Sequence, residues 1–503
     1  MQNKNRNQQG YKIKKRSLTT WLSIGFLSLQ CGQLYASDNL PDLGSPDLVE
    51  YDLQTEQSLG RAFTQALHTQ FDLVQDPEIL NYIRQLSYHI ASNSGNKRDF
   101  SFYVINNDSI NAFAGPNGVI GIHTGLIAKV DKADELASVI AHEIAHVTQQ
   151  HLSRTYEYNS TQGSLNSFAT LIAAILVGMV DPNAGMATLM GGMGMNMQDQ
   201  LKNSREHEKE ADNVGIQIMY EAGYDPHAMG AFFGKLAKES QFNALQVPEI
   251  LRTHPVTLSR LTAAENRAQV MPPLKIRKQP NDLTLIKLRV AALDQKLDQV
   301  DQRQLTSDER CYLDNLNQLT AKLSQNKFKK STDKLQCLQQ AAQKDLLQPL
   351  YSTLLIERLQ QFADRHYQPA LDKYLAKARN LIEYQQDIWP TNLAVRVRHA
   401  ELLEMQNESE KAQLTLQDGL QQEHNHYQIN NYLAQFARRH HQEATANYYQ
   451  AQAQVAIGNY ARAKHFIEQA EILNKQNQEG ISQKINYFKA KHEDKLRKPS
   501  KPD

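Results

Sequence analysis

Two histidines four residues apart, in His142-Glu-Ile-Ala-His146, place the strongest constraint on how this chain can fold. Residues i and i+4 lie on one face of an α-helix, so both imidazoles can point at one metal ion. Apolar residues recur at helical spacing from Leu136 to Val147, which predicts a helix that begins near Lys132. Two ligands do not complete a metal site, so the fold must bring a third from elsewhere in the chain.

The residue types in this segment indicate a particular chemistry. Neutral imidazole is a good ligand for Zn²⁺, which takes about four ligands in proteins. Glu143 lies about 100° around the helix from His142, where its carboxylate can take a proton from a water activated by the metal and pass it to a leaving amine. Two unrelated surface histidines are the alternative, but their neighbours are apolar or small, and buried imidazoles without partners are costly. The segment therefore predicts one zinc ion per chain, with His142 and His146 as ligands and Glu143 as general base.

The third ligand is expected on a helix within residues 204–215, which offers several acidic side chains. Glu206 and Glu210 fall on the polar face of that helix, whereas Glu208 falls on the inward face. The inward face also carries three small or apolar residues, Ala211, Gly215 and Ile218. Glu208 is therefore the favoured ligand, and His207, which borders the same face, is the alternative.

Three more residues are considered for roles at the metal site. Asp212, one turn after Glu208, can accept a hydrogen bond from a ligating imidazole and fix its orientation. Arg260, one turn into a later helix, is a candidate for stabilising the oxyanion of a tetrahedral intermediate. His151 is out of step with the three-histidine pattern, in which the third ligand stands six residues after His146, so it is not expected to bind the metal.

The pattern of the chain changes along its length of 503 residues, which is too long for one typical domain. Short β-branched and aromatic runs at Phe100–Ile105 and Val119–Thr124 predict strands among helices. After prolines at positions 272, 273 and 280, the pattern is helical to about residue 490, and small and aromatic residues over 458–470 are typical of a tetratricopeptide helix pair. The predicted fold is an α+β zincin-type metallopeptidase domain, mostly helical with a small sheet, followed by an all-α tetratricopeptide-like repeat domain. The predicted bounds are a signal peptide (1–36), the zinc metalloprotease domain (37–270), a linker (271–282), the repeat domain (283–494) and a disordered tail (495–503).

The first 36 residues are typical of an export signal. Six basic and no acidic residues precede an apolar stretch, Leu18–Leu29, and Ala36 ends a small-residue cleavage site. An uncleaved anchor is the alternative, although the apolar stretch is short for the ~20 residues that a membrane span needs. Cleavage would leave 49 basic and 54 acidic residues, a net charge of −5, which gives no general electrostatic reason to bind nucleic acid.

Cys311 and Cys337 would be the two cysteines left after cleavage. In an oxidising compartment, two cysteines in neighbouring helices favour a disulfide. Two buried thiols are the alternative, because a sequence does not reveal the Cα separation that decides between them.

Residues 165–198 are apolar and rich in Met and Gly. Each apolar piece is too short to span a bilayer. The segment is expected to form a mobile helical pair beside the active site or to make peripheral contact with a membrane surface. A buried core helix is the alternative.

The motif His142–His146, followed by Glu208 and Asp212 four residues apart, resembles the membrane-linked zinc peptidases that include the CAAX prenyl proteases and the heat-shock protease HtpX. Further segments carry the same resemblance: 111–121, 124–127, 204–212 and 252–257. The resemblance is dense over about residues 45–270 and extends to the repeat region by architecture alone.

The resemblance implies a periplasmic zinc endopeptidase in outer-membrane quality control, which helps barrel proteins to assemble and degrades those that stall. Its implied partners are unfolded or stalled outer-membrane proteins and, through the repeat domain, the barrel assembly machinery. It also implies that His254 is a removable fourth ligand that holds the enzyme latent; a loop histidine that caps local structure before Pro255 is the alternative. The helical region is larger than catalysis needs, so a chaperone or scaffold with latent protease activity is the competing class of function.

Overall fold

The computed structural model describes residues 53–160, 197–242, 248–274, 282–320, 333–363, 371–422, 426–474 and 479–497. Residues 49–503 form one compact unit. The predicted export signal, the Met- and Gly-rich segment as far as residue 196 and the last six residues of the predicted tail lie outside the described residues. None of the described helices is long and apolar enough to cross a membrane.

A three-stranded sheet lies in the first part of the chain. Its order is β1-β3-β2, with β1 (Ser101–Ile105) parallel to β3 (Val119–His123) and β2 (Ala112–Ala114) antiparallel to β3. The strands agree with the predicted runs to within one residue at each end. Gly118, just before β3, has φ +69°, and a Cβ there would collide with the carbonyl oxygen of Asp99. Glycine is therefore needed where the chain enters β3.

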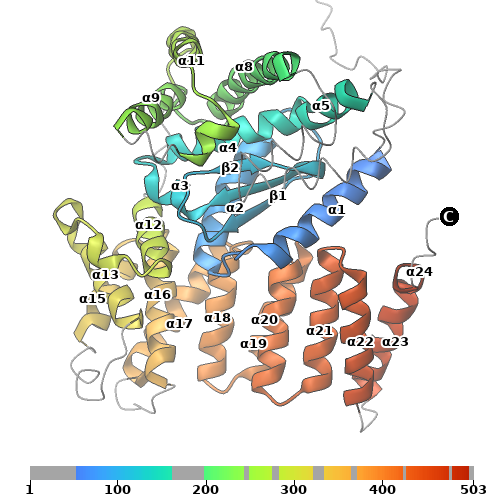
Figure 1. Cartoon of the computed structure of the whole chain (residues 1–503). Helices are drawn as coiled ribbons and strands as arrows, with labels where there is room; N and C mark the ends of the chain where they lie inside the picture. The colour runs from blue at the N-terminus through green and yellow to red at the C-terminus, as the bar shows by residue number, and fades with distance from the viewer. Residues whose placement is uncertain are drawn as a thin grey trace, which may run out of the picture. The chain divides into compact units, whose positions relative to one another are not determined.

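Helices surround this sheet, and α4 (Ala133–Thr148) is the central one. Figure 1 shows α4 running between the strands and α8, and it contacts β2, α2, α8 and α9. Because it is covered on several sides, α4 is buried at nearly every position. The other elements of this part are α1 (Leu53–Gln70), α2 (Pro77–Ser92), η1 (Pro116–Gly118), α3 (Thr124–Lys129), α5 (His151–Ser160), α8 (Met197–Glu221), α9 (His227–Phe242), α10 (Glu249–Thr253) and α11 (Leu258–Val270).

The second part consists of helices, most of which pack against the next helix along the chain. They are α12 (Asp282–Leu293), η2 (Leu297–Gln299), η3 (Gln302–Gln304), α13 (Ser307–Thr320), α15 (Asp333–Lys344), α16 (Pro349–Ala363), α17 (Leu371–Ile388), α18 (Leu393–Met405), α19 (Ser409–Asp418), η6 (Gly419–Gln421), α20 (His426–Arg439), α21 (Glu443–Ala456), α22 (Tyr460–Leu473), α23 (Glu479–Lys491) and α24 (Glu493–Leu496). The predicted fold class, a mostly helical domain with a small sheet followed by an all-helical region, is confirmed. The tetratricopeptide assignment stays a prediction.

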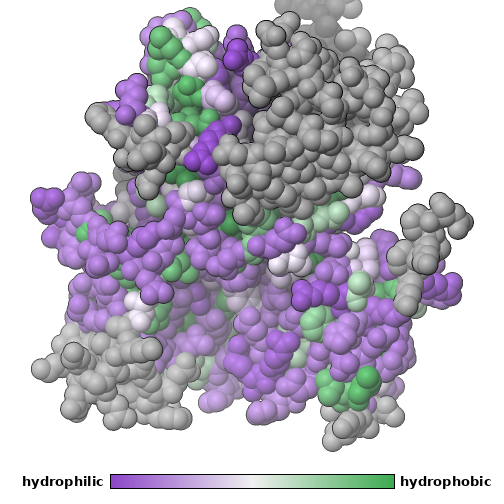
Figure 2. All heavy atoms as spheres, in the orientation of Figure 1, coloured by the Kyte–Doolittle hydropathy of each residue, from purple (hydrophilic) through white to green (hydrophobic). Residues whose placement is uncertain are grey.

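The helical part exposes a polar surface. Figure 2 shows hydrophilic side chains over most of the visible face of these helices, with apolar side chains in small groups. Most of their buried apolar side chains belong to a core that extends from Val74, before α2, to Tyr449 in α21, and those of α22 and α23 form a separate cluster. The two parts of the chain therefore share apolar packing.

A buried network of charges also joins the two parts. Arg289 of α12 binds Asp76 and Glu78 at the start of α2, at 2.6 and 2.9 Å, and binds Glu357 of α16 at 2.8 Å. Arg398 of α18 contacts Glu78 as well, at 2.8 Å. Because both guanidiniums are almost fully buried, these ion pairs are poorly screened and fix α2 against the second part.

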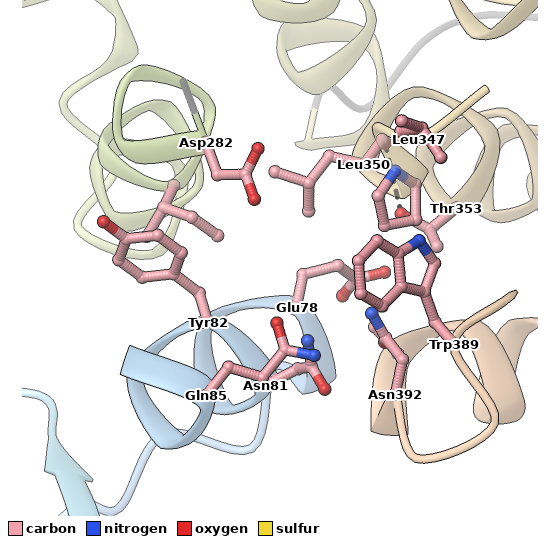
Figure 3. Close-up of a pocket in the computed structure, with 13 residues that line it drawn as sticks. Glu78, Asn81, Tyr82, Gln85, Asp282, Leu347, Leu350, Thr353, Trp389 and Asn392 are labelled. Carbon is pink, nitrogen blue, oxygen red and sulfur yellow. Dashed lines mark hydrogen bonds between the residues drawn. The ribbon is translucent and has the colours of Figure 1, made fainter. Parts of the chain in front are cut away.

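A cavity of about 70 Å³ lies beside this network. Figure 3 shows Tyr82, Asp282, Leu350 and Trp389 around it. Ligand pockets usually measure about 300–1,000 Å³, so this cavity is small for a ligand.

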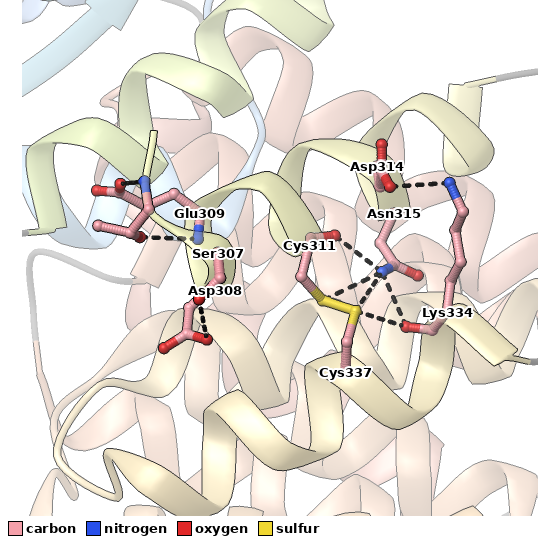
Figure 4. The surroundings of a disulfide bond; sticks show 9 residues. Ser307, Asp308, Glu309, Cys311, Asp314, Asn315, Lys334 and Cys337 are labelled. Carbon is pink, nitrogen blue, oxygen red and sulfur yellow. Dashed lines mark hydrogen bonds and ion pairs between the residues drawn. A yellow bond between two sulfur atoms is a disulfide. The ribbon is translucent and has the colours of Figure 1, made fainter. Parts of the chain in front are cut away.

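The predicted disulfide between Cys311 and Cys337 is present, with a Cα–Cα distance of 6.2 Å. It joins α13 to α15 (Figure 4). The side-chain amide of Asn315, also in α13, donates a hydrogen bond to the carbonyl oxygen of Lys334 at 3.0 Å. The two helices are thus held together by a covalent bond and a buried hydrogen bond.

Candidate metal centre

Helices α4 and α8 approach each other closely at the first histidine of the motif. Gly215 of α8 faces the backbone of His142, and a Cβ on it would lie 3.1 Å from the Cα and the amide nitrogen of His142. Such a contact is tighter than ordinary packing allows. The glycine therefore lets α8 come near enough for Glu208, two turns earlier, to reach both histidines.

Four side chains converge between α4, α8 and the loop after α10. One possible ligand atom from each of His142, His146, Glu208 and His254 lies within 4.8 Å of all the others. The two motif nitrogens, Nε2 of His142 and Nε2 of His146, are 3.1 Å apart. The carboxylate of Glu208 lies 3.4 Å from each of these nitrogens, through Oε2 and Oε1 respectively. All three predicted ligands and the predicted fourth one thus lie around one point.

Glu143 lies beside this point and is 1 % exposed. Neither oxygen of its carboxylate has a hydrogen-bond partner among the described residues. The nearest basic group is Nε2 of His254, 3.6 Å from Oε1. A buried carboxylate with free acceptor positions can receive a proton, which is what a general base must do.

Asp212 and Arg260 support the cluster from behind. Oδ1 of Asp212 lies 3.0 Å from Nδ1 of His142, as expected for a residue that orients this imidazole. Arg260 donates hydrogen bonds from Nε and Nη2 to the two oxygens of Asp212, at 2.7 and 2.8 Å. Nη1 of Arg260 reaches Oε2 of Glu208 at 2.8 Å and the carbonyl oxygen of Pro255 at 2.8 Å. Each of the three guanidinium nitrogens therefore has at least one acceptor nearby.

Burial and the neighbouring charges shift the pKa values of His142, His146 and Glu208 in different directions. Burial alone would lower the pKa of His142, but hydrogen bonds with Asp212 and Glu208 and the charges of these carboxylates raise it to about 10. Burial lowers the pKa of His146 to about 3. Burial would raise the pKa of Glu208, but the charge of His254 and hydrogen bonds with the histidines hold it well below its usual value.

These observations fit a divalent cation. A tetrahedral zinc ion with ligands at ~2.0–2.1 Å separates its ligand atoms by about 3.4 Å, close to the distances found here. With neutral histidines, the carboxylates of Glu143, Glu208 and Asp212 against Arg260 give a net charge of −2, which one such ion would neutralise. Imidazole and carboxylate are ligands that zinc accepts.

His254 is presented by a tethered loop. It directly follows α10, and its Nδ1 lies 2.8 Å from Oε1 of Glu208. The amide of Ile250 in α10 donates a hydrogen bond to the carbonyl oxygen of Ile110, next to β2, at 3.0 Å. After the loop, Thr257 caps α11, whose Arg260 binds Glu208 and Asp212. The loop is thus anchored on both sides of His254.

Two residues, His151 and Glu210, lie beside the cluster in a way that the sequence did not predict. Nδ1 of His151 lies 2.9 Å from Nδ1 of His146, and Nε2 of His151 lies 3.1 Å from Oε2 of Glu210. His207, the alternative ligand, stacks on the ring of His151 at 4.3 Å and does not belong to the cluster of possible ligands. The helical periodicity of the sequence did identify the inward face of α8. It did not indicate that His151, beyond the end of α4, would contact His146.

Residues 75–268 match the model of Peptidase family M48. They include all the residues of the cluster. This segment is therefore similar to the peptidases of family M48.

Three known proteins align with this chain over 184 to 301 residues. The chain is 36% identical over 301 residues to the beta-barrel assembly-enhancing protease of Escherichia coli K12, which covers 59% of this chain and 60% of that protein. It is 39% identical over 243 residues to the protein of the same name from Yersinia pestis, covering 48% of this chain and 50% of that one. The bovine mitochondrial metalloendopeptidase OMA1 is 31% identical over 184 residues, 36% of this chain and 34% of its own length. The chain thus matches between about a third and three fifths of the length of these relatives.

Proposed function

We propose that this chain is a zinc-dependent endopeptidase of the periplasm that acts in outer-membrane protein assembly and quality control. The observation that carries the proposal is the convergence of His142, His146 and Glu208 around one point. Beside it lies the carboxylate of Glu143, which accepts no hydrogen bond from the described residues. The relatives named beta-barrel assembly-enhancing protease and metalloendopeptidase support a peptidase reaction and a connection with barrel assembly.

Each residue of the cluster has a role in this proposal. His142, His146 and Glu208 would hold one zinc ion, which when bound supplies polarisation of the scissile carbonyl and a lowered pKa for the attacking water. Glu143 would accept the proton of that water and deliver it to the leaving amine. Asp212 would keep the Nδ1 nitrogen of His142 protonated and its Nε2 lone pair directed at the metal.

We assign a positioning role to Arg260. The oxyanion role requires an N–H group that is free to meet the substrate, whereas this guanidinium already donates to Asp212 and to the carbonyl oxygen of Pro255 and forms an ion pair with Glu208. It therefore acts on the reaction through Glu208 and Asp212.

The substrate would enter as an extended segment. β2 pairs with β3 along one edge, and no other described strand pairs with β2. Backbone groups on such an edge can accept an added strand. Helix α4, which carries the motif, packs against β2, so a segment bound there would lie near Glu143.

The direct test replaces Glu143 with Gln. The carboxamide has the same shape but does not accept the proton, so cleavage of an unfolded protein should be lost while zinc content stays near one per chain. Glu206→Gln provides the matched control, because Glu206 is an exposed residue of α8 outside the cluster. Cleavage at the wild-type rate by Glu143→Gln would overturn the assignment.

His254 is proposed as a removable ligand that keeps the enzyme latent. Its ring contacts Glu208 at 2.8 Å and approaches Glu143 at 3.6 Å, so in this position it occupies the space next to the general base. Replacing His254 with Ala should raise basal proteolysis. Unchanged proteolysis with unchanged zinc affinity would refute the latch and leave the peptidase assignment intact.

A scaffold is the second candidate function, favoured by the helical part that runs from α12 to α24. Stacked helices commonly bind extended segments or other proteins, here stalled outer-membrane proteins or the barrel assembly machinery. The Glu143→Gln protein, expressed in cells that lack the wild type, separates the two candidates. Full recovery of barrel assembly would favour the scaffold, and no recovery would favour proteolysis.

A further inference from the structure

The helical backbone is interrupted between the end of α4 at Thr148 and the start of α5. Gln150 adopts a left-handed conformation with φ +56°, which costs a residue other than glycine roughly 1 kcal/mol. α5 begins at the next residue, His151. In a continuous helix, His151 would lie about 140° around the axis from His146, but the turn at Gln150 brings the two rings to a centroid distance of 4.8 Å.

The ring of His151 lies between a predicted zinc ligand and a carboxylate. Its Nδ1 is 2.9 Å from Nδ1 of His146, and its Nε2 is 3.1 Å from Oε2 of Glu210. Arg154 donates a hydrogen bond to the same carboxylate oxygen at 2.9 Å. His151 is 4% exposed, and His207 stacks on its ring with an angle of 11° between the planes. The ring is therefore held in place from its edge and from its face.

The order of these contacts fixes where the protons lie. The carboxylate of Glu210 only accepts hydrogen bonds, so Nε2 of His151 must be the donor. In a neutral imidazole the other nitrogen then carries a lone pair, so Nδ1 of His151 accepts from Nδ1–H of His146. The remaining nitrogen of His146, Nε2, is left with its lone pair, and this is the atom that lies 3.1 Å from Nε2 of His142.

We propose that His151 is a positioning residue for the zinc ligand His146, and that it acts with Glu210 as a two-step hydrogen-bond relay. The relay holds His146 in the tautomer that binds a metal through Nε2. It also makes the lone pair of that nitrogen a stronger ligand for the metal. Asp212 does the same for His142 by direct contact. The two ligands of α4 are thus supported differently, one by a carboxylate and the other by an imidazole backed by a carboxylate.

This inference rests on the proposed zinc site and is tested by zinc affinity, measured in competition with a chelator on the full chain. Removal of such a support typically weakens metal binding about 10- to 100-fold. His151→Leu should show a loss of that size. His151→Asn, whose amide oxygen can take the place of Nδ1 as acceptor, should retain affinity better than His151→Leu.

Two variants of α8 separate the relay from simple packing. Glu210 has a side chain that is 36% exposed, so Glu210→Gln should fold normally and still weaken zinc binding. Glu206→Gln removes the same charge from the same helix at an exposed position and should leave zinc affinity unchanged. In the His151→Leu background, Glu210→Gln should have no further effect, because the relay is already broken.

A spectroscopic measurement reports on the proton itself. In the cobalt-substituted protein, Nδ1–H of His146 should give a shifted proton resonance that exchanges slowly with solvent, and His151→Leu should speed this exchange. Equal zinc affinity and equal exchange in the wild type and His151→Leu would refute the relay. Absence of stoichiometric zinc in the wild type would instead refute the proposed function.

Discussion

Loss of the Arg260 side chain should destabilise the metal-free protein more than any other single change at the site. Arg260 is 4% exposed and binds both oxygens of Asp212 and one of Glu208. Its guanidinium also donates to the carbonyl oxygen of Pro255 and lies over the ring of Phe233, 5.0 Å from the centroid. One side chain thus links α11 with α8, α9 and the loop that carries His254.

The expected size of the effect follows from burial. Removing one partner of a buried ion pair leaves the other charge unpaired and costs about 3–5 kcal/mol. Arg260→Met should therefore lower the free energy of unfolding of the metal-free protein by about that amount. Arg260→Lys keeps a charge but not the planar fork that meets Asp212, so it should lose less.

Bound zinc should restore part of the free energy of unfolding that Arg260→Met loses. A bound cation would compensate the carboxylate of Glu208, although not that of Asp212. Urea unfolding of the metal-free and zinc-loaded forms should therefore show a smaller penalty for Arg260→Met with zinc. Arg267→Met, on the same helix but without an ion pair among the described residues, is the control. A loss below about 1 kcal/mol for Arg260→Met without metal would contradict the reasoning.

Three further predictions concern the close approach of two helices, the disulfide and a buried histidine. Gly215→Ala should weaken zinc binding, measured by chelator competition, because the added methyl group meets the backbone of His142; unchanged affinity would show that α8 has room to move. Replacing Cys311 and Cys337, which are 26 residues apart, with Ser should cost about 3.5 kcal/mol by loss of the loop constraint, whereas equal urea midpoints would exclude this constraint. Burial lowers the pKa of His123 to about 4 from its usual 6.5, so the unfolded chain binds the proton more readily and stability should fall, by up to about 3 kcal/mol, as the pH drops from 6.5 to 4. His123→Leu should remove that part of the pH dependence, and an unaltered profile would contradict it.

Local pattern predicted much of this structure. The apolar spacing from Leu136 to Val147 identified α4, and the β-branched runs identified β1 and β3. Periodicity also separated Glu208, which faces α4, from Glu206, which is exposed. These features follow from the repeat of a single helix or strand, which a sequence displays directly.

Contacts that depend on a change of chain direction could not be predicted in the same way. His151 reaches His146 only because Gln150 takes a left-handed conformation, for which glutamine gives no signal. Glu210 was assigned to the polar face of α8, and its side chain is indeed 36% exposed. Its carboxylate nevertheless contacts His151 of the neighbouring helix α5. The engagement of Arg260 likewise depends on the packing of α11 on α8.

In the proposed site, side chains from two helices, α4 and α8, bind one metal ion, and Glu143 takes a proton from the water beside it. The most direct test of this proposal is the zinc content of the purified protein together with its cleavage of an unfolded substrate. The account predicts one zinc ion per chain in the wild type and in Glu143→Gln, cleavage by the wild type alone, and loss of zinc in His142→Ala and in Glu208→Ala. A wild-type protein without stoichiometric zinc, or a His142→Ala protein that retains both metal and cleavage, would contradict it.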